Sequence, residues 1–182
     1  LTDNDVANKL GTRAATWKQA AKDMLLQSIV SEKREHTIVV KVMYKLQKQE
    51  SFIRIDYIVY PNGVIDVNYT LTVNRGDLPE IPRVGMYMVM NGEYDQMTWF
   101  GRGPHENYSD RKTSANVDLY EKDVWSQFEP YVRPQETANK SDVRWFTLRN
   151  KSGEGLLFKG KQLLNASAWN FPMEDIDYVP FN

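Results

Sequence analysis

The stretch of sequence richest in groups that can do chemistry runs from Trp99 to Arg111, Trp-Phe-Gly-Arg-Gly-Pro-His-Glu-Asn-Tyr-Ser-Asp-Arg. Its two glycines permit unusual backbone angles, and its proline stiffens the chain that follows. Acidic, basic and hydrogen-bonding side chains then crowd into one short segment. These types fit two interpretations equally well: a polar loop that faces a ligand, or an arginine–carboxylate network that pins a long loop to its scaffold.

Hydrolysis of a glycosidic bond needs two opposed carboxylates, about 5–5.5 Å apart for retention and about 6.5–9.5 Å apart for inversion. Glu106 and Asp110 lie in one short segment, with no evident partner on an opposing wall. We therefore assign no catalytic residue to this chain. We also predict no metal site and no cofactor within it, because the two histidines, His36 and His105, lie in different contexts and there is no cysteine.

Composition narrows the classes of function. The chain has 182 residues, near the usual size of one domain, and its formal net charge of -1 argues against a nucleic-acid binder. No run approaches the roughly 18 apolar residues of a membrane span, so we expect no membrane partner. The five Trp, ten Tyr and seven Phe favour β-strands, and such rings can also cover the apolar face of a sugar.

The hydropathy pattern alternates with a period of two from Leu25 onward, which indicates β-strands. The predicted strands are 37–46, 52–60, 65–73, 84–90, 94–100, 115–120, 143–149, 155–160 and 163–169. Asn62-Gly63 and Asn91-Gly92 predict hairpins, because both positions of such a turn favour positive φ. Short turns between alternating strands predict an all-β fold, an antiparallel sandwich.

Helices are expected to be short at most. Residues 12–22 predict one helix that Thr12 caps, and Pro172 can begin another over 172–177. The long irregular segments 101–112 and 129–142 are where function usually sits on a β-scaffold. We expect one domain over 1–182, and a C-terminally incomplete fragment of a larger multidomain enzyme, because no closing strand ends the sequence.

The segment from Trp99 to Arg111 resembles a motif of a known family. Trp99-x-Gly-x-Gly-Pro-x-Glu-Asn-Tyr-x-Asp-Arg111 resembles the hallmark of the C-terminal domain of large β-galactosidases of glycoside hydrolase family 2. Thr2-Asp-Asn-Asp5, Leu78-Pro-x-x-Pro-Arg-Val-Gly85 and Tyr131-Val-x-Pro-Gln-Glu136 resemble further motifs of that domain in the same order. The similarity therefore covers nearly the whole chain.

The resemblance implies a galactose-mutarotase-like antiparallel β-sandwich, the supersandwich. It also implies a full-length bacterial enzyme, cytoplasmic or periplasmic and homo-oligomeric, that hydrolyses terminal β-galactosides such as lactose with retention. Two Glu residues, Mg and a monovalent cation would be held mainly by a central barrel domain that this chain lacks. We accordingly expect the isolated chain to be inactive.

The resemblance places this domain at one side of the active site, where its loop would shape and gate access rather than break bonds. The candidate rim residues are Gly101, Gly103, His105, Glu106, Asn107, Tyr108 and Arg111. The glycines fit a loop that changes its backbone angles. Trp169 does not match the galactose-stacking tryptophan of the family, and we assign it to packing in the last strand.

Three alternatives remain open. A stand-alone carbohydrate-binding module would stack sugars on Trp99, Tyr108, Trp125 or Tyr131; an exposed pair of Trp rings would support it, and burial of all five would remove it. A mutarotase-like epimerase would need His105 as acid and Glu106 as base, and rests on fold analogy alone. An assembly domain would expose an apolar patch larger than a few hundred Å².

Overall fold

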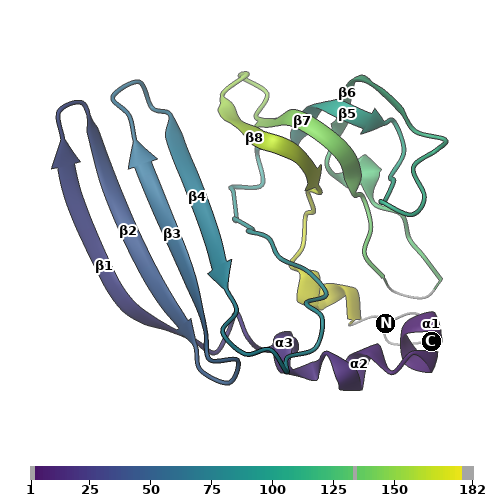
Figure 1. The fold of residues 1–182 in the computed structure, drawn as a ribbon. Helices are drawn as coiled ribbons and strands as arrows, with labels where there is room; N and C mark the ends of the chain where they lie inside the picture. The colour runs from purple at the N-terminus through teal and green to yellow at the C-terminus, as the bar shows by residue number, and fades with distance from the viewer. Residues whose placement is uncertain (1–2, 133–134, 178–182) are drawn as a thin grey trace. The chain divides into compact units, whose positions relative to one another are not determined.

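The computed structural model describes residues 3–132 and 135–177, and the chain divides into two compact units. The first unit spans Asp3–Gly85 and the second Met86–Asn182. Each described unit contains one four-stranded antiparallel sheet, drawn in Figure 1 in purple to teal for the first and teal to yellow for the second. Helices are short in both. The predicted all-β class with antiparallel sheets and short helices is confirmed, whereas the single domain over 1–182 stays a prediction.

The sheet of the first unit is a meander of consecutive hairpins, in the order β1-β2-β3-β4. Its strands are β1 (Met24–Arg34), β2 (Thr37–Leu46), β3 (Ser51–Val59) and β4 (Ile65–Thr72). The predicted strands 37–46, 52–60 and 65–73 match β2, β3 and β4 to within one residue at each end. The hairpin at Asn62-Gly63 is confirmed, because Gly63 has a φ of +84° and the Tyr60 N–H donates to the Val64 carbonyl at 2.9 Å.

The predicted helix over 12–22 is wrong as a single element. The structure has three short helices instead, α1 (Asp3–Ala7), α2 (Leu10–Arg13) and α3 (Ala15–Lys18). Tertiary contacts explain the breaks: the buried Gln49 amide donates to the Thr16 carbonyl at 2.5 Å, and the Trp17 indole donates to the Pro79 carbonyl at 3.1 Å. Thr12 does not cap a helix, and Lys9 occupies the N-cap position of α2.

The core of the first unit lies on one face of its sheet, where the segment that follows α3 packs against β2 and β3. Ala20 packs there with Leu46, Ile53 and Ile55, and Trp17 lies against the cluster. Ile53 and Ile55 are two residues apart on β3, so their side chains share one face of the sheet. The alternation seen in the sequence therefore corresponds to a buried face in this part of the fold.

The second unit has the strand order β6-β5-β7-β8. Its strands are β5 (Gln96–Gly103), β6 (Asn116–Asp123), β7 (Lys140–Arg149) and β8 (Gly155–Ala166), with single-turn 3₁₀ helices η1 (Trp125–Gln127) and η2 (Met173–Asp177). The predicted helix at 172–177 is thus a 3₁₀ helix. The predicted strands 155–160 and 163–169 form one strand, and Trp169 lies beyond its end.

The predicted strand 84–90 is wrong in this structure, since residues 83–91 have no strand pairing. Asn91-Gly92 therefore does not join two strands. The physical reason lies in β5, where the predicted hairpin would have paired. Both sides of β5 are already occupied, by β6 and by β7.

The core of the second unit gathers around Trp99, which is fully buried. Met97, Val124, Val143 and Ala166 pack with it. The Trp99 indole N–H donates to the Arg102 carbonyl at 3.0 Å, so this buried polar group is satisfied within β5 itself.

Gly101 and Gly103 lie in β5, and both are buried. Among the described glycines, positive φ angles occur at Gly63 and Gly153, so the expectation of unusual angles at Gly101 and Gly103 is wrong. Close packing explains instead why glycine occupies these two positions. A Cβ on Gly101 would lie 2.9 Å from the Val143 Cα, and one on Gly103 would lie 2.7 Å from the Tyr120 ring.

We expect Gly101→Ala to lower the free energy of unfolding by about 1–3 kcal/mol, because overpacking against the Val143 backbone forces a shift of β5 or β7. Gly92→Ala is the matched control in the same unit, since a Cβ there meets nothing within 4 Å. Urea unfolding of the two variants measures the difference. Equal stability of both would contradict the close-packing explanation.

Candidate functional site

The loop that contains most of the predicted rim residues lies between the end of β5 and the start of β6, over residues 104–115. The prediction of an irregular segment over 101–112 is therefore wrong for 101–103, which belong to β5. The loop packs against residues 138–142, which include the first three residues of β7. The loop also closes on itself: Tyr108 and Arg111 form an isolated antiparallel bridge, with the Arg111 N–H donating to the Tyr108 carbonyl at 3.0 Å. Two segments that are far apart in sequence thus build one local structure.

Asn107 forms the centre of this contact and is completely buried. Its backbone N–H donates to the Asn139 carbonyl at 2.8 Å, and its own carbonyl accepts from the Asn139 amide at 2.6 Å. Its side-chain oxygen accepts from the Ser141 N–H at 2.8 Å, while its side-chain nitrogen donates to the His105 carbonyl at 3.0 Å. Asn107 therefore anchors the loop and is not presented to a ligand.

Glu106 is the second anchor, and its side chain is only 9% exposed. One carboxylate oxygen accepts the Ala138 N–H at 2.8 Å and the Tyr108 hydroxyl at 3.5 Å. The other accepts the Tyr131 hydroxyl and lies 3.7 Å from the Arg111 guanidinium. A carboxylate engaged in this way is a poor candidate for a catalytic base, which agrees with its assignment outside the catalytic machinery.

A second charge cluster holds the other end of the loop. Asp142 accepts hydrogen bonds from Arg102 at 2.5 Å and Lys112 at 3.0 Å, and Arg102 also donates to the Ala115 carbonyl at 2.8 Å. The bond from Arg102, with that from Lys112, holds the pKa of Asp142 below its usual range. The pinning network is therefore confirmed as one of the two interpretations of this loop.

Lys140 is a buried cation that sequence analysis missed. It is 1% exposed, donates to the Ala138 carbonyl at 3.0 Å, and places its ammonium 5.1 Å from the centre of the Trp99 ring. Burial, with a smaller contribution from the charge of Lys122, lowers the pKa of Lys140 to about 8. The sequence carries no signal for it, because a lysine in a strand is normally exposed.

Other side chains of the loop are exposed or half-buried, unlike Glu106 and Asn107. The His105 ring nitrogen lies 3.0 Å from the Ser114 hydroxyl, and both side chains are exposed. The Arg111 guanidinium lies over the half-buried Tyr108 ring, 4.0 Å from its centre. Burial, then the charge of Glu106, raises the pKa of Tyr108. His105 and Arg111 are thus exposed polar residues of this loop, together with Ser109, Asp110, Thr113 and Ser114.

The structure consequently divides the predicted rim residues into three groups. Gly101 and Gly103 belong to β5, and Glu106 and Asn107 form the buried base of the loop. His105 and Arg111 are exposed, and the half-buried Tyr108 lies between Glu106 and Arg111. His105 and Glu106 do not face a common space, since Glu106 is held by Tyr131 and Ala138 while His105 contacts Ser114. This arrangement offers no support for the epimerase alternative.

The five tryptophans differ in exposure, which bears on the carbohydrate-binding alternative. Trp125 is 62% exposed and stacks on Phe128, with ring centres 6.0 Å apart, whereas Trp99 is fully buried. The other three tryptophans are half-buried. Trp169 donates to the Thr137 carbonyl at 2.9 Å and stacks on Phe171, so its assignment to packing is confirmed although it lies outside the strand.

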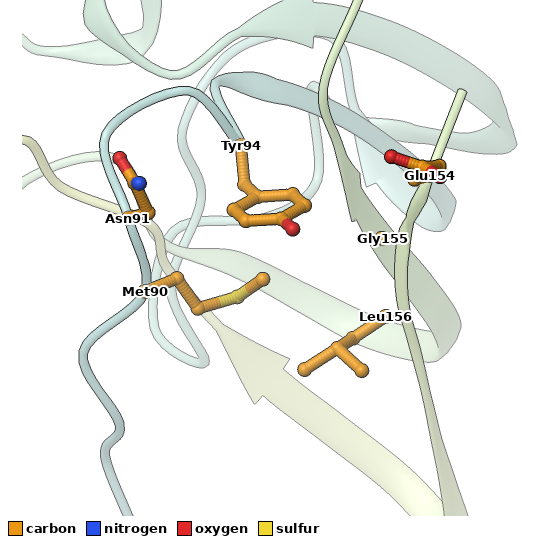
Figure 2. A pocket seen from close by; sticks show the side chains of 6 residues that line it. All are labelled: Met90, Asn91, Tyr94, Glu154, Gly155 and Leu156. Carbon is orange, nitrogen blue, oxygen red and sulfur yellow. The ribbon is translucent and has the colours of Figure 1, made fainter. Parts of the chain in front are cut away.

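A pocket of about 470 Å³ lies elsewhere in the second unit. Figure 2 shows the six residues that line it, which come from the segment before β5 and from the start of β8: Met90, Asn91, Tyr94, Glu154, Gly155 and Leu156. None belongs to the predicted site. Over residues 3–132 and 135–177, no group of three or more side chains is arranged to hold a metal ion, and no helix has the length and apolarity to cross a membrane.

Comparison with known proteins decides the family. The β-galactosidase small-chain family matches residues 1–181. The chain belongs to this family. The match covers both units and includes the whole loop.

Curated relatives agree with this membership. A β-galactosidase of Priestia megaterium is 38% identical over 181 residues, which is 100% of this chain and 17% of that protein. A β-galactosidase of Lactobacillus delbrueckii subsp. bulgaricus is 32% identical over 179 residues, 97% of this chain and 18% of that protein. The chain thus spans less than a fifth of the length of these relatives.

We expect Asn107→Ala to lower the free energy of unfolding by about 2–4 kcal/mol, because it leaves the buried Ser141 N–H without its acceptor and removes the partner of the His105 carbonyl. Ser109→Ala, an exposed change in the same loop, should stay within about 0.5 kcal/mol. Thermal or urea unfolding compares the two. A stable Asn107→Ala variant would show that the anchor is dispensable.

Lys140 predicts a specific dependence of stability on pH. Its pKa is about 8 in the folded chain, below that of an unfolded lysine, so the unfolded state binds the proton more tightly. Stability should therefore rise as pH increases from about 8 toward 10.5. Lys140→Met keeps the volume and lacks the titrating group, and should lose this part of the rise. Parallel pH profiles of the two proteins would contradict the assignment.

Proposed function

We propose that this chain is a domain of a β-galactosidase that hydrolyses terminal β-galactosides such as lactose with retention of configuration. The observation that carries the proposal is the family match over residues 1–181, together with the names of the relatives. In this proposal the catalytic carboxylates, Mg and a monovalent cation belong to other domains of the same polypeptide. The chain contributes one side of the active site.

The partners of Glu106 in the loop and of Asp142 in β7 support this assignment of the catalytic groups to other domains. Glu106 accepts backbone and tyrosine donors, and Asp142 is paired with an arginine and a lysine. Neither is left to act as one of two opposed carboxylates. A chain of this kind shapes and borders a site whose bond-breaking groups are supplied elsewhere.

The loop is suited to a rim because it combines a fixed base with polar groups above it. Asn107 and Glu106 tie the base to residues 138–141, while His105 and Arg111 stay exposed. We assign the gating movement to residues 108–111, since they lie between the Asn107 anchor and the bond from Lys112 to Asp142. Such a movement would alter access to the substrate without unfolding the base.

The division of labour is tested by comparing the 182-residue chain with the full-length protein. We expect the full-length protein to hydrolyse o-nitrophenyl β-galactoside and lactose, and the chain alone to release no product at equal concentration. Proton NMR of the first-formed galactose should show the β-anomer, as retention requires. Hydrolysis by the pure chain would overturn the assignment of the catalytic groups to other domains.

The rim role is tested with His105→Ala in the full-length protein. If the loop borders the substrate, this change should alter KM or kcat by about threefold or more with little loss of stability, because His105 contributes only an exposed contact to Ser114. Ser152→Ala, in the exposed turn between β7 and β8, is the control and should leave both constants unchanged. Identical kinetics of both variants and the parent protein would remove the rim role.

A second candidate, a carbohydrate-binding module, is favoured by one observation: the exposed Trp125 ring, supported from below by Phe128. Saturation-transfer NMR of α-galactose with the 182-residue chain distinguishes the two. Saturation transfer that Trp125→Ala abolishes would support a binding surface on this chain, whereas its absence would leave the domain role alone. Faster anomeric exchange would instead revive the epimerase.

A further inference from the structure

An extended segment of the second unit has the sequence of a strand but no strand pairing. Residues 86–90, Met-Tyr-Met-Val-Met, are apolar throughout, and Tyr87 and Val89 are 92% and 87% exposed. Among the described residues, no backbone hydrogen bond is formed by residues 86–90. Unpaired N–H and C=O groups on an extended apolar segment are a template for pairing with another strand.

A second free edge belongs to β8. The order β6-β5-β7-β8 leaves one side of this 12-residue strand without a neighbour, although Lys159 and Lys161 place charge on it. Three leucines of β8 are nevertheless exposed, and Leu157 reaches 64%. A long edge strand with exposed leucines is unusual in an isolated fold, because it invites edge-to-edge association.

The pocket of about 470 Å³ lies where the end of segment 86–90 approaches the start of β8. Met90, Asn91 and Tyr94 line it from the segment that leads into β5, and Glu154, Gly155 and Leu156 line it from the turn before β8 and from β8 itself. In Figure 2 the Met90 and Leu156 side chains approach the pocket from opposite sides, with the Tyr94 ring above them. The space is therefore bordered by an unpaired segment, a strand edge and apolar side chains.

We propose that one β-strand from the part of the same protein outside this chain inserts here, pairing with the edge of β8 on one side and with residues 86–90 on the other. This inference rests on the proposed function in one respect: the inserted strand must come from a longer polypeptide that contains this chain. The relatives supply the reason for this occupant: the matched region is only 17–18% of their length, so most of each relative lies outside it. The side chains of Met90, Tyr94 and Leu156 in the pocket lining fit a strand whose alternate residues are apolar.

Amide hydrogen exchange tests the pairing directly. In the full-length protein, amides of 86–90 should exchange at least about 100-fold more slowly than in the 182-residue chain, and outward-facing amides of β8 should slow with them. The turn at 61–63 serves as a control that exchanges quickly in both, and β3 as one that is slow in both. Fast exchange of 86–90 in both proteins would overturn the proposal.

Other occupants give different results, each of which would also overturn it. Protection that appears in the 182-residue chain and rises with its concentration would mean that a second copy pairs here. Protection of the pocket residues in that chain on adding galactose would mean a sugar site. A full-length protein that is protected but lacks galactosidase activity would remove the proposed function and leave the inserted strand standing.

A matched pair of variants gives a second measurement. Val89→Asp should lower the melting temperature of the full-length protein by several degrees, because it buries a charge beside the inserted strand, and should leave the 182-residue chain unchanged. Val64→Asp, at the exposed tip of the β3–β4 hairpin, is the control and should affect neither. Equal melting temperatures of the full-length Val89→Asp and parent proteins would contradict the insertion.

Discussion

The buried Asn107 side chain is the constraint on which the candidate site depends. An asparagine with no contact to water must find partners for its donors and its acceptor within the protein. Asn107 finds them in His105 of its own loop and in Ser141 of the segment that begins β7. A loop of twelve residues between β5 and β6 is thereby held in place by a strand that follows it by more than thirty residues. The Glu106 and Asp142 contacts then hold the loop on either side of this buried amide.

The electrostatics of the site follow from the same packing. Segment 137–142 approaches the loop closely enough to bury Glu106 and Lys140, and each is compensated differently. Glu106 accepts hydrogen bonds, which suits a charge withdrawn from water. Lys140 has one carbonyl and the face of Trp99, and burial therefore lowers its pKa. The packing that holds the base of the loop therefore also buries Lys140, and this burial disfavours its charged form.

The second unit differs between its loop, where buried polar groups are hydrogen-bonded, and its sheet edge, where apolar side chains are exposed. In the loop, nearly every buried polar group has a partner inside the chain, so this region is built to be complete. At residues 86–90 and along the edge of β8, the chain exposes strand-forming segments and apolar side chains. This contrast is consistent with the proposed rim loop and with the proposed pairing of an additional strand, and with the small share of the relatives' length that the chain covers.

Sequence periodicity by itself determined the all-β class and most of the strands, because alternation with a period of two is a local property that pleating imposes. The spacing of motifs around the loop determined the family. Tertiary contacts decided the rest. Gln49 and Pro79 interrupt the predicted helix over 12–22, and the occupied sides of β5 leave 84–90 unpaired. Which side chains of the loop are buried anchors and which are accessible was likewise settled by Tyr131 and residues 138–142, which lie too far along the chain for any local pattern to reveal.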